Sequence, residues 1–150
     1  STLSSSSAAS DVYKRQRLYR CWTEPALIQQ WFAPSPWSVS RVDNDVRPGG
    51  HSLIVMRSPE GQEMPGSGVY LEVIPNRRLV FTDAFTQGWV PADKPFMTGI
   101  VSFDPEGAQT RYTARVRHWS AADRAQHEAM GFHTGWGQCT DQLAKLAARL

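Results

Sequence analysis

The C-terminal stretch from Ser120 to Leu150 carries the clearest hydrophobic pattern in the chain. Its apolar residues recur at steps of three and four, which places them on one face of an α-helix. Ser120 is a favoured N-cap residue, and Asp123 lies in the first turn, where a carboxylate stabilises the helix terminus. We therefore predict one long C-terminal helix with an apolar stripe of Phe132, Trp136, Cys139, Leu143, Leu146 and Leu150.

Three glycines, Gly131, Gly135 and Gly137, interrupt this pattern. An interior glycine costs a helix about 1 kcal/mol relative to alanine. In one interpretation the helix breaks near Gly131 or packs closely against a strand. In the other, the glycines leave room for a ligand beside Trp136, and glycine alone does not distinguish the two.

Between residues 37 and 119 the hydrophobic period changes to two, and turns rich in Pro and Gly separate the alternating stretches. The last stretch alternates most regularly, with Tyr112, Ala114, Val116 and His118 on one face and Thr113, Arg115, Arg117 and Trp119 on the other. One apolar and one polar face is typical of an antiparallel sheet. The pattern predicts strands at 37–46, 51–57, 64–74, 78–85, 95–103 and 110–119, with short helices at 15–22 and 26–32 before them.

Two short helices, about six strands and one long helix indicate an α+β domain. Tight turns join consecutive strands into a meander, and a curved sheet can bury its apolar face by wrapping around the stripe of the long helix. A strongly bent sheet does not close fully on one helix. We therefore predict a ligand cavity between the sheet and the C-terminal helix.

The composition predicts a single domain at 11–150. Residues 1–10, S-T-L-S-S-S-S-A-A-S, are low in complexity, and we expect them to be disordered or a non-native leader. A net charge of +2 with scattered basic residues argues against nucleic acid as a partner. No apolar run approaches the roughly 20 residues that span a bilayer. The absence of a signal-peptide pattern and the presence of only two cysteines, Cys21 and Cys139, predict a reduced, cytoplasmic protein, with a disulfide as the alternative.

Five segments occur in one order: C-W-T-E-P-A-L-I-Q-Q-W-F-A-P (21–34), D-V-R-P-G-G (45–50), G-V-Y-L-E-V-I-P (68–75), R-L-V-F-T-D (78–83) and M-G-F-H-T-G-W-G-Q-C-T-D-Q-L (130–143). Together they resemble the START-like superfamily, also called SRPBCC or birch-pollen-allergen-like. Within it they are similar to the homologues of the activator of the heat-shock-protein ATPase. The resemblance implies a helix-grip fold. Members carry a first strand where this chain has its Ser/Ala leader and D-V-Y-K-R-Q, so we expect that strand to be missing or replaced.

Candidate site residues come from the faces that would line the cavity, where aromatic side chains and a few polar groups are expected. Asp83 is either an acid, a base or a ligand contact, or it makes a structural hydrogen bond at the end of a strand. His118 either acts beside Tyr112 or is a satisfied core histidine. The predicted cavity lining is Trp31, Phe81, Asp83, Tyr112, Val116, His118, Met130, Phe132, Trp136 and Cys139.

We expect no metal site and no cofactor. His127 and His133 are six residues apart, whereas two metal ligands on one helix need a spacing near four. The favoured function is binding of a small apolar or amphipathic molecule by a monomer or homodimer. One alternative is a protein-interaction domain that assists a chaperone ATPase, as the resemblance implies. The other is a cyclase- or hydrolase-type enzyme, which would need two of Asp83, Tyr112 and His118 to meet at one ligand position.

Overall fold

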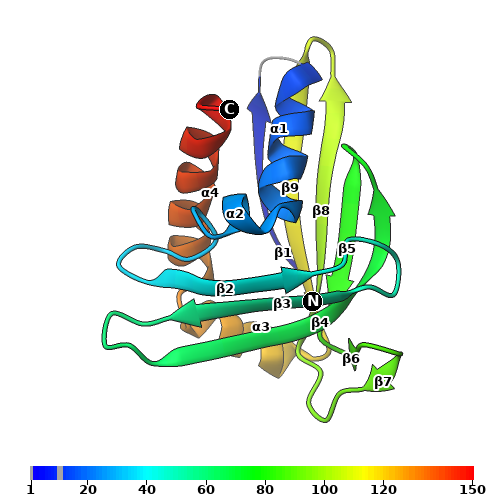
Figure 1. The fold of residues 1–150 in the computed structure, drawn as a ribbon, viewed down its shortest axis with the longest axis vertical. Coiled ribbons are helices and arrows are strands. Elements are labelled where there is room, and N and C mark those ends of the chain that lie inside the picture. The colour runs from blue at the N-terminus through cyan, green and yellow to red at the C-terminus, as the bar shows by residue number, and fades with distance from the viewer. Residues whose placement is uncertain (1, 10–11) are drawn as a thin grey trace.

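The computed structural model describes residues 2–9 and 12–150 of the chain, with an antiparallel sheet curved around helices (Figure 1). The seven strands of this sheet lie in the order β1-β9-β8-β5-β4-β3-β2. Their bounds are β1 Thr2–Ala9, β2 Ser38–Asn44, β3 His51–Arg57, β4 Glu63–Ile74, β5 Arg78–Thr82, β8 Met97–Glu106 and β9 Gln109–His118. A separate short hairpin joins β6 Phe85–Thr86 to β7 Val90–Pro91. The predicted α+β helix-grip class is confirmed.

The N-terminal segment differs from the expectation of disorder. Thr2–Ala9 forms β1 and pairs antiparallel with β9, from Thr2 opposite Arg117 to Ala9 opposite Thr110. A strand needs only backbone N–H and C=O groups to add to the open edge of β9, so a low-complexity composition does not prevent the pairing. The first strand, which we expected to be missing or replaced, is therefore formed by the Ser/Ala segment itself. The alternative hypothesis, that residues 1–10 are a non-native leader, is about where these residues come from, and it stays a prediction.

The long C-terminal helix is divided in two. Helix α3 spans Ala121–Ala129 and α4 spans Phe132–Ala148, and Gly131 between them has a φ of 88°. A left-handed φ suits glycine because it has no Cβ to clash with the backbone. Of the interpretations open for the glycines, the break near Gly131 is the one observed, so the helix predicted from Ser120 is interrupted there. The Ser120 cap is also confirmed, since its side chain accepts a hydrogen bond from the Asp123 amide.

The N-terminal helices are α1 Val12–Thr23 and α2 Pro25–Ile28. Pro25 stands at the start of α2, where its missing N–H costs nothing. The helix predicted at 26–32 continues only as turns after Ile28, and the chain reaches Pro34 without a further helix.

The core lies between the inner face of the sheet, α1 and α4. The apolar stripe of α4 is buried at Phe132, Cys139, Leu143 and Leu146, as the spacing predicts. Figure 1 shows α1 and α4 running alongside β8 and β9, whereas β2, β3 and β4 turn across the lower part of the molecule. The helices therefore cover one half of the curved sheet much better than the other. None of the described helices has the length and apolar character needed to cross a bilayer.

Candidate functional site

A cavity of about 350 Å³ lies against the half of the sheet that the helices cover least. Its floor comes from β3, β4 and β5, and its remaining walls come from α1, the segment after α2, and the start of β8. Its walls are mostly apolar: the lining is Trp22, Phe32, Ser52, Ile54, Met56, Met64–Tyr70, Leu79, Phe81, Thr82, Asp83, Phe96 and Met97.

Two glycines of β4 add no side-chain volume to the floor of the cavity. Gly66 is directly opposite Ile54 on β3, and Gly68 is opposite Ser52, so each pair shares the inner face of the sheet. A Cβ on Gly68 would lie 2.2 Å from the Thr82 carbonyl oxygen, so packing requires glycine there. A Cβ on Gly66 would lie 3.5 Å from the Ile54 carbonyl oxygen, an ordinary contact. Packing does not require glycine at position 66, and its missing side chain leaves space in the cavity.

Methionines form an adaptable part of the wall. Three of the four methionines in the chain, Met56, Met64 and Met97, line the cavity. Met56 and Met64 are cross-strand partners, and Met64 is 44% exposed, which places it at the open side of the cavity. The flexible, polarizable thioether can adjust to ligands of different outline. The site is therefore suited to apolar shape recognition more than to a fixed set of hydrogen bonds.

The polar groups of the lining mostly hold the protein together. Asp83 Oδ1 accepts hydrogen bonds from the backbone amides of Phe96 at 2.9 Å and Met97 at 3.1 Å. The structural role considered for Asp83, a hydrogen bond at the end of a strand, is therefore observed, although the residue also lines the cavity. The Tyr70 hydroxyl accepts from Asn44 Nδ2 at 3.2 Å, and burial raises the pKa of this phenol. Tyr70 is thus a neutral group at physiological pH.

An aromatic cluster separates the cavity from the C-terminal helix. The Trp22 ring lies 5.9 Å from Phe81 and 5.8 Å from Trp136, measured between centroids. Phe32 also contacts Trp136, at 6.4 Å. Trp22 and Phe32 line the cavity, while Trp136 of α4 lies behind them. The cavity therefore lies between the sheet and an aromatic wall from the N-terminal helical region, and not directly on the C-terminal helix.

Of the ten predicted lining residues, Phe81 and Asp83 are in the lining that the structure shows. Trp31, Tyr112 and Cys139 are in the buried core, and the Trp31 Nε1–H donates to the Cys21 carbonyl oxygen at 2.8 Å. Trp31 also lines a second hollow of about 230 Å³ beside Gln142. Met130 is 66% exposed because it lies at the break after α3. Val116, His118, Phe132 and Trp136 are inside the fold but outside the lining of the larger cavity.

Sequence reasoning missed most of β3 and β4 as cavity walls. Ser52, Ile54 and Met56 follow the alternation of β3, and the Pro65–Gly68 run was a visible signal of a strand with little side-chain volume. Alternation shows which residues share a face. It does not show which part of that face the helices leave uncovered, because this depends on the curvature of the sheet.

The groups considered for catalysis are not assembled at the cavity. Only Asp83 of the three candidates lines it, whereas Tyr112 is a core residue. His118 Nε2 lies 2.8 Å from His127 Nδ1, in a hydrogen bond between imidazoles. Within the described part of the chain, no three His, Cys, Asp or Glu side chains form a group that could hold a metal ion.

The family model described as "Activator of Hsp90 ATPase homolog 1-like protein", AHSA1, matches residues 13–148. The chain belongs to this family. The match includes the aromatic wall, the β3–β4 floor and both C-terminal helices. No curated protein matches this AHSA1 family chain.

Solved structures give the same fold. Protein NE0264 from Nitrosomonas europaea is 38% identical, with a TM-score of 0.91 over 99% of this chain and 94% of that chain. Protein Ms6760 from Mycobacterium smegmatis is 25% identical, with a TM-score of 0.78 over 97% of this chain and 89% of that chain. The AHSA1-like protein from Aeromonas hydrophila, 18% identical with a TM-score of 0.72 over 99% and 93% of the two chains, shares the fold alone.

Proposed function

We propose that this AHSA1 family protein binds a small apolar or amphipathic molecule in the cavity over β3, β4 and β5. The observation that carries the proposal is the cavity of about 350 Å³, a size typical of small-molecule sites, with its mostly apolar walls. The absent side chain at Gly66 is the second support, because packing would accept a larger residue there. The cavity therefore includes space beside Gly66 that the packing of the fold does not require.

The walls indicate how a ligand would lie. Its apolar body would rest on Ile54, Met56 and Phe81, where burial of apolar area contributes roughly 25 cal/mol per Å². Ser52 carries a hydroxyl on the inner face of the floor, and a single polar group on the ligand could bond there. The exposed β4 segment around Met64 provides the entrance.

Filling the cavity tests the proposal. The probe is N-phenyl-1-naphthylamine, an uncharged aromatic whose fluorescence rises in apolar surroundings. Gly66→Leu would put a side chain into the floor, and we expect its dissociation constant for the probe to rise by about tenfold or more, equivalent to about 1.4 kcal/mol. Native mass spectrometry of the wild-type protein would identify any ligand retained from the producing cell.

The matched control is Gly137→Leu, on an open face of α4 where nothing lies within 4 Å of the new Cβ. It makes the same substitution away from the cavity and should leave probe binding unchanged. Equal probe affinity in the wild type and a folded Gly66→Leu variant would contradict binding in this cavity, as would a wild-type protein that binds no probe.

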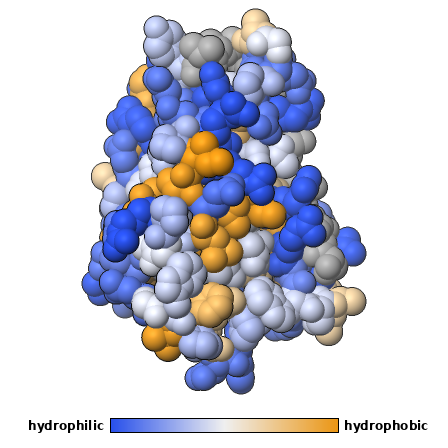
Figure 2. Space-filling view, turned by 90° about the vertical axis from the view of Figure 1, so that its right-hand side faces the viewer, coloured by the Kyte–Doolittle hydropathy of each residue, from blue (hydrophilic) through white to orange (hydrophobic). Residues whose placement is uncertain are grey.

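A protein-interaction role is the second candidate, favoured by an apolar patch on the outer face of the sheet. We define this outer patch as Leu71, Ile74, Val80 and Ile100; Leu71 and Ile74 are 38% and 45% exposed. Figure 2 shows apolar surface in the middle of this side of the molecule, bordered by hydrophilic residues. Exposed apolar patches often mark protein contacts. The family name makes a chaperone ATPase the partner to try first.

The variant Leu71→Asp combined with Ile74→Asp tests this second role. Both side chains are exposed, so the fold should persist while apolar docking is lost. The measurement is the ATP hydrolysis rate of a heat-shock-protein ATPase with and without this protein. Tyr13→Asp, an exposed residue on α1, is the control. No stimulation by the wild type, or equal stimulation by the double variant, would exclude the role.

We also propose a cytoplasmic location for the protein. Cys21 and Cys139 are both free and buried, and no disulfide joins them. Burial raises the pKa of each thiol to about 11, so both remain protonated at neutral pH. Inert, unpaired thiols support a reducing compartment.

A further inference from the structure

Two histidines connect the end of the sheet to helix α3. His118 is at the end of β9 and His127 is in the last turn of α3, with 2.8 Å between His118 Nε2 and His127 Nδ1. Their rings lie 5.1 Å apart in an edge-on arrangement. A hydrogen bond between two imidazoles requires one nitrogen with its proton and one without.

Helix α3 has few other attachments. None of the residues of α3 is buried, so the helix lacks an apolar anchor of its own. His127 supplies ring contacts with Phe96 at 5.3 Å and Phe132 at 4.7 Å, in addition to its bond to His118. Gly131 separates α3 from α4 and has a left-handed backbone that breaks helical continuity. The two helices can therefore separate at this point without unfolding α4.

Phe96 connects the histidine pair to the cavity. Its ring packs 5.6 Å from His118 and 5.3 Å from His127, and the same residue lines the cavity. Met97 is a second connection, since it lies opposite His118 in the β8–β9 pairing and also lines the cavity. The Phe96 ring therefore packs on the two imidazoles, while Asp83 holds the backbone of Phe96 and Met97.

We propose that the His118–His127 pair is a pH-sensitive latch that holds α3 on the sheet and thereby controls ligand retention in the cavity. This inference rests on the proposed binding function. The occupied cavity is favoured while the latch is closed, because Phe96 is then held in place as part of its wall. Opening the latch frees α3 and loosens that wall.

The number of protons bound to the two imidazole rings determines when the latch opens. With one or no net positive charge on the pair, Nε2 and Nδ1 share a proton and the bond persists. A further proton gives both nitrogens an N–H, so no acceptor remains and two like charges face each other. Burial first, and the charge of His118 second, lower the pKa of His127. The closed latch therefore resists protonation until the pH falls below the ordinary imidazole pKa of about 6.5.

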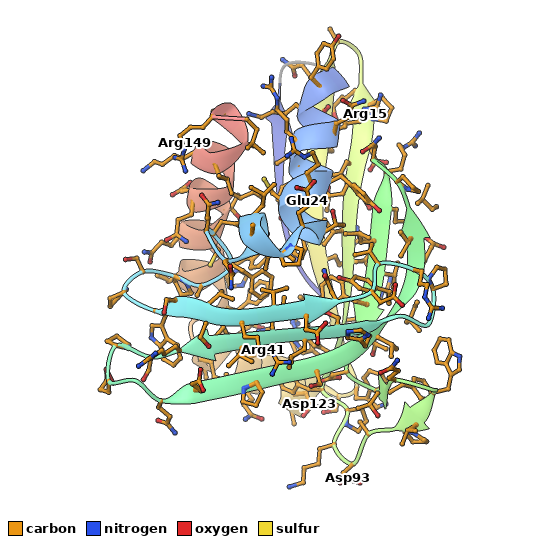
Figure 3. All side chains as sticks on the ribbon, viewed as in Figure 1. Arg15, Glu24, Arg41, Asp93, Asp123 and Arg149 are labelled. Atoms are coloured by element: carbon orange, nitrogen blue, oxygen red, sulfur yellow. The ribbon has the colours of Figure 1, made fainter. Side chains whose placement is uncertain are left out.

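Other charged side chains lie near the two histidines, but none of them replaces the hydrogen bond between His118 and His127. On α3, Arg124 pairs with Glu128 at 3.1 Å, and the Asp123 amide donates a hydrogen bond to the Ser120 side chain, which caps the helix. His133 follows Phe132 on α4, and Asp93 and Lys94 precede β8. Figure 3 places Asp93 and Asp123 at the same end of the molecule, opposite Arg15 and Arg149. The first electrostatic partner of His127 is His118.

Hydrogen exchange tests the latch without any ligand. Amide protection at 121–129, corrected for intrinsic rates, is compared at about pH 7.5 and about pH 5.5, on either side of the ordinary imidazole pKa of about 6.5. We expect it to fall about tenfold at the lower pH, with α4 protected at both. His127→Asn replaces Nδ1 by an oxygen that accepts at any pH, and should remove the pH dependence. His118→Gln is the second variant should the first not fold, and His133→Asn is the control that should behave as wild type.

Probe binding tests whether the latch controls ligand retention in the cavity. The dissociation constant for N-phenyl-1-naphthylamine should rise severalfold from pH 7.5 to 5.5 in the wild type, towards the roughly tenfold limit set by a one-unit difference in one imidazole pKa between free and bound protein. It should stay constant in His127→Asn. Unchanged α3 protection in the wild type, or an equal loss in His127→Asn, would overturn the latch.

Failure of the latch to regulate binding and failure of the binding function itself give different results. If α3 is released by acid but probe affinity does not change, the latch exists and does not regulate the cavity. If the probe ignores Gly66→Leu at pH 7.5, the binding function itself fails. The regulatory claim then falls with it, while the exchange data still decide whether acid releases α3.

Discussion

At the scale of single residues, Gly66 and Gly68 show that two glycines close together on one strand can have different structural roles. Both are on β4 and both line the cavity. Gly68 allows the Thr82 backbone to approach, whereas Gly66 only leaves space. In the sequence they are two equivalent glycines in P-G-S-G, because the difference depends on how closely the paired strand β5 approaches each of them.

Alanine substitutions should separate these roles. Gly68→Ala puts a Cβ 2.2 Å from a backbone oxygen, and we expect a loss of about 1 to 3 kcal/mol in the free energy of unfolding. Gly66→Ala meets only ordinary contacts and should be neutral or stabilise by up to about 1 kcal/mol. Urea unfolding of both variants gives the comparison. Equal losses would show that position 66 is also packing-limited.

At the scale of elements, the strands were predictable, and the sequence placed the ends of some of them but not of others. The strand predicted at 51–57 is β3, His51–Arg57. The strand predicted at 78–85 ends as β5 at Thr82, because Asp83 turns to accept the Phe96 and Met97 amides and the chain enters the β6–β7 hairpin. Side-chain capture of distant backbone groups leaves no periodic trace in the sequence.

The break between α3 and α4 provides a prediction at this scale. Gly131→Ala forces a side chain into a φ of 88°, which should cost about 1 to 2 kcal/mol. Gly137→Ala, inside α4 with open space around it, should instead stabilise by about 1 kcal/mol. Circular dichroism during urea unfolding measures both. Stabilisation by Gly131→Ala would mean that α3 and α4 form one continuous helix in solution.

At the scale of the whole molecule, the pKa shifts predict stability lost in two steps on acidification. The lowered pKa of His127 means that the unfolded chain takes up a proton more readily, so stability declines as the pH falls from the ordinary imidazole value of 6.5. Asp43, bonded to His51, and Glu106, bonded to Arg111, have pKa values lowered from 3.8 and 4.5, so their contribution is lost only in more acidic solution.

Thermal unfolding across this pH range would show the two steps. His127→Asn should remove the step that begins near 6.5 and leave the more acidic step in place. The control His133→Asn should keep both. A first step that survives in His127→Asn would assign it to another group.

The sequence by itself determined the elements and their faces: the α4 stripe, the alternation of β9 and the membership of the family. These depend on residues close together in the chain, or on motifs in a given order. Only the tertiary structure decided where the cavity lies and that Trp22 and Phe32 stand between it and Trp136. It also decided that β9 accepts β1 at its edge and that His118 meets His127. The reason is physical: sheet curvature and helix placement arise from the packing of the whole chain, and no local pattern encodes which part of an apolar face remains uncovered.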